Sequence, residues 1–180
     1  MMRRMIAVCL LTLAQPLAAQ WNQTDPKGNP VPSGKEHAYS GDFGTLQLST
    51  VDPNRLHADW ATPTPGVEIQ TQTTAMRNQR IFTFIVFRGC QAGPDGNCNV
   101  TARFEIFDPA GKPYGDPNSG PIWKSLPAPP GNLQLGMSAT GLMVENGELL
   151  GDYTVRISTT DNVAKITLTT EQVLTITEAK

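Results

Sequence analysis

Histidine and cysteine are scarce in this chain, which has two histidines and three cysteines among its 180 residues. Catalytic triads and zinc centres are built mostly from these residue types, so the sequence offers few ways to assemble either. It also lacks a Gly-x-Ser-x-Gly elbow, a His-Glu-x-x-His helix and a glycine-rich phosphate loop. We therefore predict that the protein is not an enzyme, with no catalytic residue, no metal ligand and no cofactor.

Positive charge is not in excess either. The chain has 14 Lys and Arg against 16 Asp and Glu, a formal net charge of −2, and a pI near 5.6. Proteins that bind nucleic acid usually carry a clustered basic stripe or have a pI above about 9. The basic residues here are scattered singly beyond the amino end, so nucleic acid is not a predicted partner.

Long hydrophobic runs are absent too, and one short apolar run lies at the amino end. Residues 5–13 are mostly apolar, follow Arg3 and Arg4, and precede Leu-Ala-Ala at residues 17–19. This order is typical of a secretory signal peptide, and the run is too short to span a bilayer. We predict a signal peptide at residues 1–19, export to the periplasm of a two-membrane cell or full secretion, and no membrane span in the mature chain.

Two cysteines, Cys90 and Cys98, remain after the signal peptide is removed. In an oxidising compartment two thiols this close in sequence tend to pair, and the turn-forming residues 91–97 suit a hairpin loop closed at its neck. A redox pair would need Cys-x-x-Cys spacing, and a zinc site would need further ligands. We predict a structural disulfide that stabilises the fold by about 2–3 kcal/mol.

The rest of the chain divides by composition into two parts. Residues 20–44 are mostly Asn, Gln, Asp, Pro, Gly, Ser and Lys, too polar to offset the entropy of ordering the backbone. We predict a flexible polar lead-in at residues 20–44 and a single β-sandwich domain at residues 45–180.

Alternation of apolar and polar residues dominates from residue 45 onward, and this is the pattern of half-buried strands. Residues 81–87 (Ile-Phe-Thr-Phe-Ile-Val-Phe) are apolar on both faces and predict a central strand. Prolines crowd residues 113–131, which we interpret as a long surface excursion. Seven or eight short strands and no convincing amphipathic helix predict an all-β, antiparallel β-sandwich. The other expected strands contain Leu46 and Leu48; Val67, Ile69 and Thr71; and residues 100–107, 133–137, 153–158 and 166–176.

A family resemblance lies in residues 107–112 (Phe-Asp-Pro-Ala-Gly-Lys) and 151–157 (Gly-Asp-Tyr-Thr-Val-Arg-Ile), followed by the closing strand. Over residues 45–177 the chain resembles immunoglobulin-like sandwiches of the macroglobulin-like kind in exported bacterial proteins. The resemblance implies an immunoglobulin-like β-sandwich of seven to eight strands, with Tyr153 placed for a tyrosine-corner hydrogen bond. The sequence departs from antibody domains in lacking a disulfide between the two sheets.

Three aromatic residues, Trp60, Tyr114 and Trp123, fall in expected loops or beside prolines. Tyr and Trp on a rigid sandwich can stack on sugar rings or fill a partner's pocket, and they can equally cover an edge of the core. We name them candidate binding residues and leave both roles open.

Other chemistry-bearing residues form weaker patterns. His37 and His57 are expected to be ordinary surface side chains, the second in a loop beside Asp59. Asp95 opens a spacing of side-chain oxygens like that of a calcium loop, but Val100 occupies the place of the required glycine. A tight turn is the better interpretation of that segment.

These observations predict an exported, non-catalytic β-sandwich that acts as a protein-interaction module in the periplasm or envelope, with an envelope protein as partner. The alternative is a carbohydrate-binding module that holds a polysaccharide with Trp60, Tyr114 and Trp123. A third hypothesis, a hydrolase with a carboxylate pair, has no motif in its favour.

Overall fold

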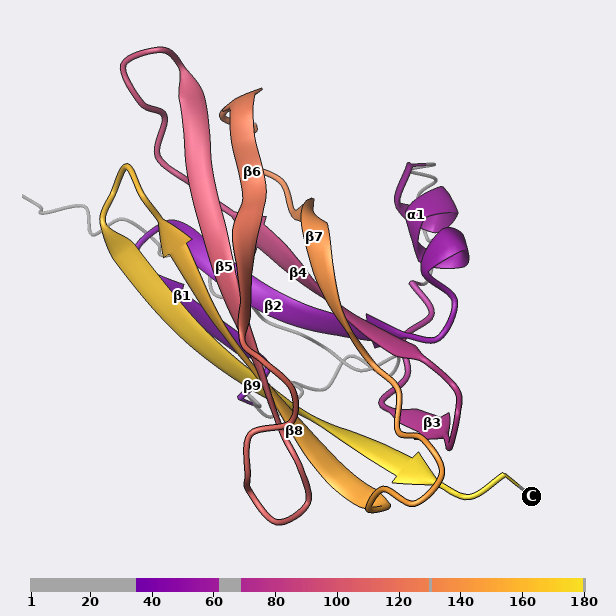
Figure 1. Ribbon diagram of the computed structural model, residues 1–180. Coiled ribbons are helices and arrows are strands. Elements are labelled where there is room, and N and C mark those ends of the chain that lie inside the picture. The colour runs from indigo at the N-terminus through magenta and orange to yellow at the C-terminus, as the bar shows by residue number, and fades with distance from the viewer. Residues whose placement is uncertain (1–34, 62–68, 130, 180) are drawn as a thin grey trace, which may run out of the picture.

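A computed structural model describes residues 35–61, 69–129 and 131–179 and shows two β-sheets packed into a sandwich, with one short helix beside them (Figure 1). The elements in chain order are β1 (His37–Ser40), β2 (Phe43–Thr50), α1 (Pro53–Ala61), β3 (Thr74–Met76), β4 (Ile81–Arg88), β5 (Asn97–Phe107), β6 (Asn118–Pro127), β7 (Gln134–Leu142), β8 (Gly151–Asp161) and β9 (Ile166–Thr177).

The first sheet has the strand order β1-β2-β4-β7, and the second has β3-β9-β8-β5-β6. Neighbouring strands pair antiparallel except for the short β3, which runs parallel to β9. The prediction of an all-β sandwich is confirmed, with nine strands in the described residues instead of seven or eight.

The main core lies between the sheets and is built from alternate positions of long strands. On β8, Tyr153, Val155 and Ile157 are at most 1% exposed, as the period-two pattern of residues 153–158 predicts. The predicted central strand is β4, where inward-facing Ile85 and its neighbour Val86 are both fully buried. Burial on both faces explains why apolar residues occupy both sides of β4.

β2 turns its polar side toward the second sheet. Gln47 and Ser49 are each 1% exposed, and Nε2 of Gln47 donates to Oγ1 of Thr170 at 2.8 Å across the sandwich. Leu46 and Leu48 occupy the alternate positions and so face the other side of the sheet. The alternation of apolar and polar residues therefore predicted β2 correctly as a strand. Its polar side faces the interior because those residues hydrogen-bond to the opposite sheet.

Residues 53–61 form the helix α1, so the prediction of a loop there is wrong. Asp52 caps the helix by accepting the backbone N–H of Arg55 at 2.9 Å, and Pro53 takes the first helical position, where its missing N–H is not needed. Leu56 is the buried residue of this helix, and nine residues are too few for a long periodic pattern to mark the helix in the sequence. In the described part of the chain, no helix is long and apolar enough to cross a membrane.

The sheet begins inside the predicted lead-in. β1 and the first residues of β2 lie within residues 37–44, and Phe43 is 2% exposed. The backbone N–H of Glu171 on β9 donates to the carbonyl of Lys35 at 2.8 Å, which fastens the start of the described chain to the second sheet. Residues 20–34 and the predicted signal peptide lie outside the described residues.

Two other local predictions differ from the structure. Ile69 and Thr71, expected in a strand with Val67, lie before β3 and outside it, while Val67 falls outside the described residues. The proline-rich segment contains the strand β6 in place of a surface excursion. β6 is an edge strand that pairs only with β5. An edge strand tolerates residues such as Pro121 and Pro127, because one of its sides needs no backbone hydrogen bonds.

The predicted disulfide is present. Cys90 and Cys98 are bonded, with their Cα atoms 6.1 Å apart, and join the end of β4 to the start of β5. The loop between them is also closed by backbone bonds, including one from the N–H of Gly93 to the carbonyl of Asn97 at 2.8 Å. This loop is therefore a compact hairpin, as its turn-forming composition predicts.

Tyr153 makes the kind of hydrogen bond that the family resemblance implies. Its hydroxyl donates to the carbonyl of Leu149, four residues upstream, at 2.7 Å. A tyrosine corner uses such a bond to hold the chain before a core strand. Membership of the macroglobulin-like kind stays a prediction.

Replacing both cysteines by serine (Cys90→Ser with Cys98→Ser) should lower the free energy of unfolding by about 2–3 kcal/mol, because the unfolded chain regains the entropy of a short loop. Urea unfolding of the double variant and of the parent protein measures the difference. An unchanged midpoint would mean that the bond does not constrain the unfolded chain.

Candidate functional site

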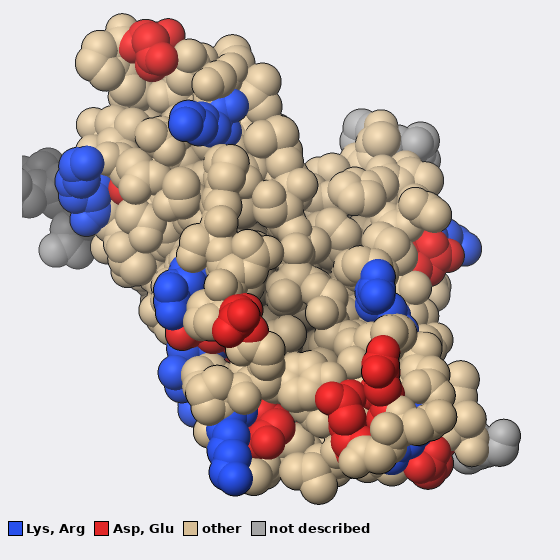
Figure 2. Space-filling model, in the orientation of Figure 1, with Lys and Arg blue, Asp and Glu red and all other residues tan. Residues whose placement is uncertain are grey.

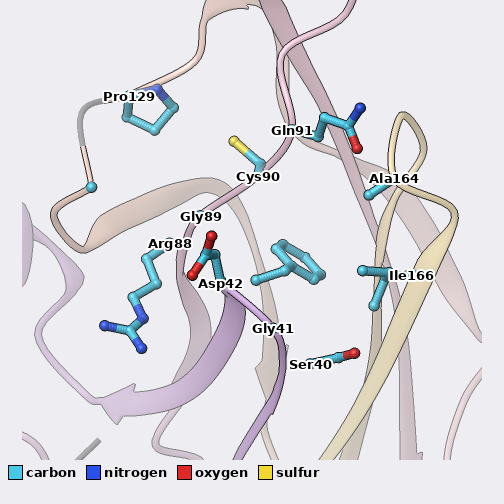
Figure 3. Close-up of a pocket in the computed structure, with 12 residues that line it drawn as sticks. Ser40, Gly41, Asp42, Arg88, Gly89, Cys90, Gln91, Pro129, Ala164 and Ile166 are labelled. Atoms are coloured by element: carbon cyan, nitrogen blue, oxygen red, sulfur yellow. The ribbon is translucent and has the colours of Figure 1, made fainter. Parts of the chain in front are cut away.

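A hollow of about 660 Å³ opens at one end of the sandwich, beside the disulfide. We call it the end hollow. Its walls come from four segments: the β1–β2 turn (residues 40–43), the end of β4 with the disulfide (residues 88–91), residues 129 and 131 before β7, and Ala164 and Ile166 at the β8–β9 turn. Figure 3 shows Pro129 and Arg88 on one side of the opening, Ala164 and Ile166 on the other, and Asp42 and Cys90 between them.

The β1–β2 turn is held against the end of β4 by a close backbone approach. Gly41 has φ +59° at the first central position of this two-residue turn, where type II′ hairpins favour glycine. Gly89 has φ +67°, and a methyl group added there would overlap the backbone carbonyl of Asp42. Only glycine at position 89 therefore lets this wall of the end hollow close.

A buried carboxylate fixes the opposite wall. Asp161, at the end of β8, is 0% exposed. Its Oδ2 accepts the backbone N–H of Gln91 at 2.7 Å, and its Oδ1 accepts those of Val163 and Ala164 at 2.9 and 3.1 Å. The β8–β9 turn and the disulfide loop are thus joined through one side chain, and both Gln91 and Ala164 line the end hollow.

The lining of the end hollow combines polar and apolar groups. Asp42, Arg88 and Gln91 bring a carboxylate, a guanidinium and an amide, while Pro129 and Ile166 bring apolar surface. Small-molecule sites of about 300–1,000 Å³ commonly pair apolar walls with a few polar groups that orient the ligand. The end hollow has the size and the chemistry to hold a small polar molecule by hydrogen bonds.

Two of the predicted binding aromatics, Tyr114 and Trp123, are packed onto the core instead. The ring of Tyr114 meets that of Tyr153 edge-on at 5.2 Å, and the ring of Trp123 meets that of Phe87 at 5.5 Å. Nε1 of Trp123 also donates to the carbonyl of Pro127 at 3.2 Å. Both side chains cover edges of the core, which was the other role left open for them.

Trp60, the third predicted aromatic, is half-buried on α1. Neither Trp60, Tyr114 nor Trp123 lines the end hollow, and no ring contact among the described residues joins any two of them. The structure therefore does not assemble the three aromatics into one sugar-stacking platform.

Tyr114 is also held through its hydroxyl, which lies 2.9 Å from Oε2 of Glu148 and 3.0 Å from the carbonyl of Met143. Burial, followed by the hydrogen bond to the Glu148 carboxylate, raises the pKa of Tyr114 well above its ordinary value near 10. Burial also raises the pKa of Tyr153. The pair of tyrosines is kept neutral by its surroundings and packs like any buried aromatic pair.

The histidines and the calcium-like spacing lead to no assembled metal site in the described residues. His57 packs edge-on against Phe84 at 5.3 Å, while Asp59 is paired with Arg55. Asp95 accepts two bonds from Asn97, and these hydrogen bonds lower the pKa of the Asp95 carboxyl. Within residues 35–61, 69–129 and 131–179, no three His, Cys, Asp or Glu side chains are grouped to hold a metal ion.

Sequence reasoning missed the end hollow for identifiable reasons. The predicted boundary at residue 45 left the β1–β2 turn outside the domain, and nothing in the sequence shows that this turn meets residues 88–91. The Gly41-Asp42 dipeptide between two short alternating segments was the available signal, because it is a hairpin turn type.

Comparison with known proteins gives little to set beside this geometry. No family model and no curated protein matches the chain. Among solved structures, the chain is similar to a family 123 glycoside hydrolase from Clostridium perfringens, described for glycolipid glycan hydrolysis, with 10% identity and a TM-score of 0.37. The match covers 75% of this chain and 27% of that one, so the chain spans about a quarter of the hydrolase.

The prediction of a non-catalytic protein-interaction module in the periplasm or envelope is corrected by this comparison. The matched structure named above is that of a glycoside hydrolase, and neither a family model nor a curated protein matches to support an interaction module. The prediction was built on missing catalytic motifs, and a missing motif carries no information about a partner. At this TM-score the likeness transfers neither the fold nor the activity of the hydrolase to this chain.

Gly89→Ala should destabilise the protein more than Gly96→Ala. Both glycines have positive φ, but a methyl group at position 96 meets open space, whereas one at position 89 meets the Asp42 backbone. The left-handed conformation alone costs about 1–2 kcal/mol for alanine, and overpacking adds about 1–3 kcal/mol. Urea unfolding of the two variants measures the gap, and equal losses would contradict the close approach.

Tyr114→Phe should flatten the fall in stability at alkaline pH. The unfolded chain ionises its tyrosines near pH 10 while folded Tyr114 keeps its proton, so the raised pKa stabilises the fold below about pH 10 and loses this effect as pH rises further. The free energy of unfolding between pH 8 and pH 11 measures the slope. Tyr153 is shifted the same way and leaves part of the slope in place. Exposed Tyr39 provides the control, and an equal flattening by Tyr39→Phe would refute the assignment.

Proposed function

We propose that this protein is an exported β-sandwich that binds carbohydrate in the end hollow. The single observation that carries the proposal is the lining of that hollow, where Asp42, Arg88 and Gln91 stand beside the apolar surface of Pro129 and Ile166. The proposal moves the site away from Trp60, Tyr114 and Trp123.

Sugars suit such a lining because they combine a dense rim of hydroxyl groups with apolar C–H faces. A carboxylate accepts and a guanidinium donates in forked geometry, while an amide does both, so these groups can hydrogen-bond neighbouring hydroxyls in pairs. The apolar walls then cover the C–H face. A volume of about 660 Å³ lies within the range of small-molecule sites.

The walls of the end hollow are fixed before any ligand arrives. The disulfide holds residue 90, the Asp161 carboxylate holds residue 91, and the contact between Gly89 and the backbone of Asp42 holds the β1–β2 turn. A preorganised site gains affinity because little conformational entropy is lost on binding. Three anchors around one hollow therefore favour a binding role.

Export is part of the proposal. The signal-like residues 1–19 and the disulfide fit an oxidising compartment, with the periplasm preferred to full secretion. We propose a binding protein without catalysis, of the immunoglobulin-like kind that the sequence resembles. A glycan of the envelope is then an accessible ligand.

Titration of the purified protein with single sugars tests the proposal. The panel contains glucose, galactose, N-acetylglucosamine and glucuronic acid, and the readout is the shift of backbone amide resonances. Signals of residues 41–43, 89–91 and 164 should move together for at least one sugar. If no panel sugar moves them, or if the shifts lie elsewhere, the proposal fails.

A matched pair of variants localises the binding. Asp42→Asn should weaken affinity for the bound sugar about 10-fold or more, because a charge-assisted hydrogen bond is lost. Asp116→Asn removes an exposed carboxylate outside the end hollow and should leave affinity unchanged. Equal effects of the two substitutions would argue against the end hollow.

A further inference from the structure

A second hollow, of about 340 Å³, lies on the other side of the disulfide loop. We define it by the residues that supply its polar and apolar walls: Asp95, Asn97, Asn99, Lys124, Ser125 and Val163. Figure 2 shows acidic atoms at the upper tip of the molecule, where the β4–β5 loop projects, and basic atoms just below them.

The two hollows share a wall. Cys90 lines the end hollow and Cys98 lines the second hollow, and the disulfide between them keeps their Cα atoms 6.1 Å apart. The β8–β9 turn repeats this arrangement, because Ala164 faces the end hollow and the adjacent Val163 faces the second. The hollows therefore border the same disulfide and the same β8–β9 turn at one end of the sandwich.

The polar groups of the second hollow are held in place by their neighbours. Asn97 donates to the Asp95 carboxylate through its backbone and its side chain, at 3.0 and 2.9 Å. Oδ1 of Asn99 accepts Nδ2 of Asn162 at 3.1 Å. These hydrogen bonds within the protein hold the side chains in place before a ligand binds.

The strand β6 contains a bulge beside the second hollow. The register between β5 and β6 shifts at Cys98 and Asn99, and Ser125 is the additional residue on β6, with φ +56°. A non-glycine residue in the left-handed region is strained, and bulges of this kind re-aim side chains at the ends of sheets. Here the bulge places Lys124 and Ser125 together on the lining of the second hollow.

From these contacts we infer that the second hollow is an adjoining subsite and that the ligand is an oligosaccharide that crosses the disulfide. This inference depends on the proposed function, since it extends the same site by one or more sugar units. Carboxylate, amide, ammonium and hydroxyl groups line the second hollow. All of these groups can hydrogen-bond the hydroxyl groups of a ligand. The amide groups of Asn97 and Asn99 also match the acetamido group of an N-acetylated sugar, which sets the choice of probe.

The test measures affinity against chain length by calorimetry. N-acetylglucosamine and its linear oligomers of two, three and four units are titrated into the purified protein. Affinity should rise at least about 10-fold between one unit and three, because the longer ligands reach the second hollow, and then level off. Equal affinity for every length, with the end-hollow resonances still moving, overturns the second subsite and leaves the proposed function standing.

Lys124→Ala tests whether the gain in affinity with chain length comes from the second hollow. It should lower affinity for the trisaccharide about 10-fold and leave affinity for the monosaccharide unchanged, while Lys112→Ala, an exposed lysine outside both hollows, should change neither. A loss by Lys124→Ala that is equal for all lengths overturns the subsite. Failure of every oligomer to bind overturns the inference, and if the single-sugar panel also fails, the proposed function falls with it.

Discussion

The end of the sandwich that carries both hollows depends on one buried carboxylate. Withdrawing a polar side chain such as that of Asp161 from water is costly unless hydrogen bonds replace the lost hydration. Three backbone N–H groups do so, from Gln91, Val163 and Ala164. Because these donors belong to two separate loops, the side chain that they satisfy also sets the distance between those loops. The disulfide and Gly89 hold other parts of the end hollow, and the shape of the site follows from these three constraints together.

The sequence was sufficient to predict the sandwich and its disulfide, because both are recorded in local patterns. The alternation at residues 153–158 and the apolar run at residues 81–87 each mark a strand whatever its neighbours are. The nine-residue helix was missed in this way, since it is shorter than the 11–18 residues over which helical periodicity is read. β2 shows a further limit, because its inward side is polar and only contact with the opposite sheet explains the burial of Gln47.

The candidate site was harder to predict because it is assembled from four segments that are distant in sequence. Pairing of β2 with β4 brings Gly44 opposite Arg88, and this register carries the β1–β2 turn to the disulfide. No residue type in the lining is unusual by itself. The aromatics drew attention through their rarity, yet Tyr114 and Trp123 owe their positions to the core, as their ring contacts with Tyr153 and Phe87 make plain.

The bonds that β9 makes at its outer edge constrain the order in which the sandwich can assemble. Glu171 is held by the carbonyl of Lys35, and β3 lies parallel along the end of β9, so each contact closes a loop of about a hundred residues or more. Loop-closure entropy makes such pairings slow and late, and a chain rich in them folds less readily during synthesis than one built from local hairpins. The sandwich cannot be completed before its last strand is available. β3 and Lys35 therefore have no partner in the second sheet until β9 has been made.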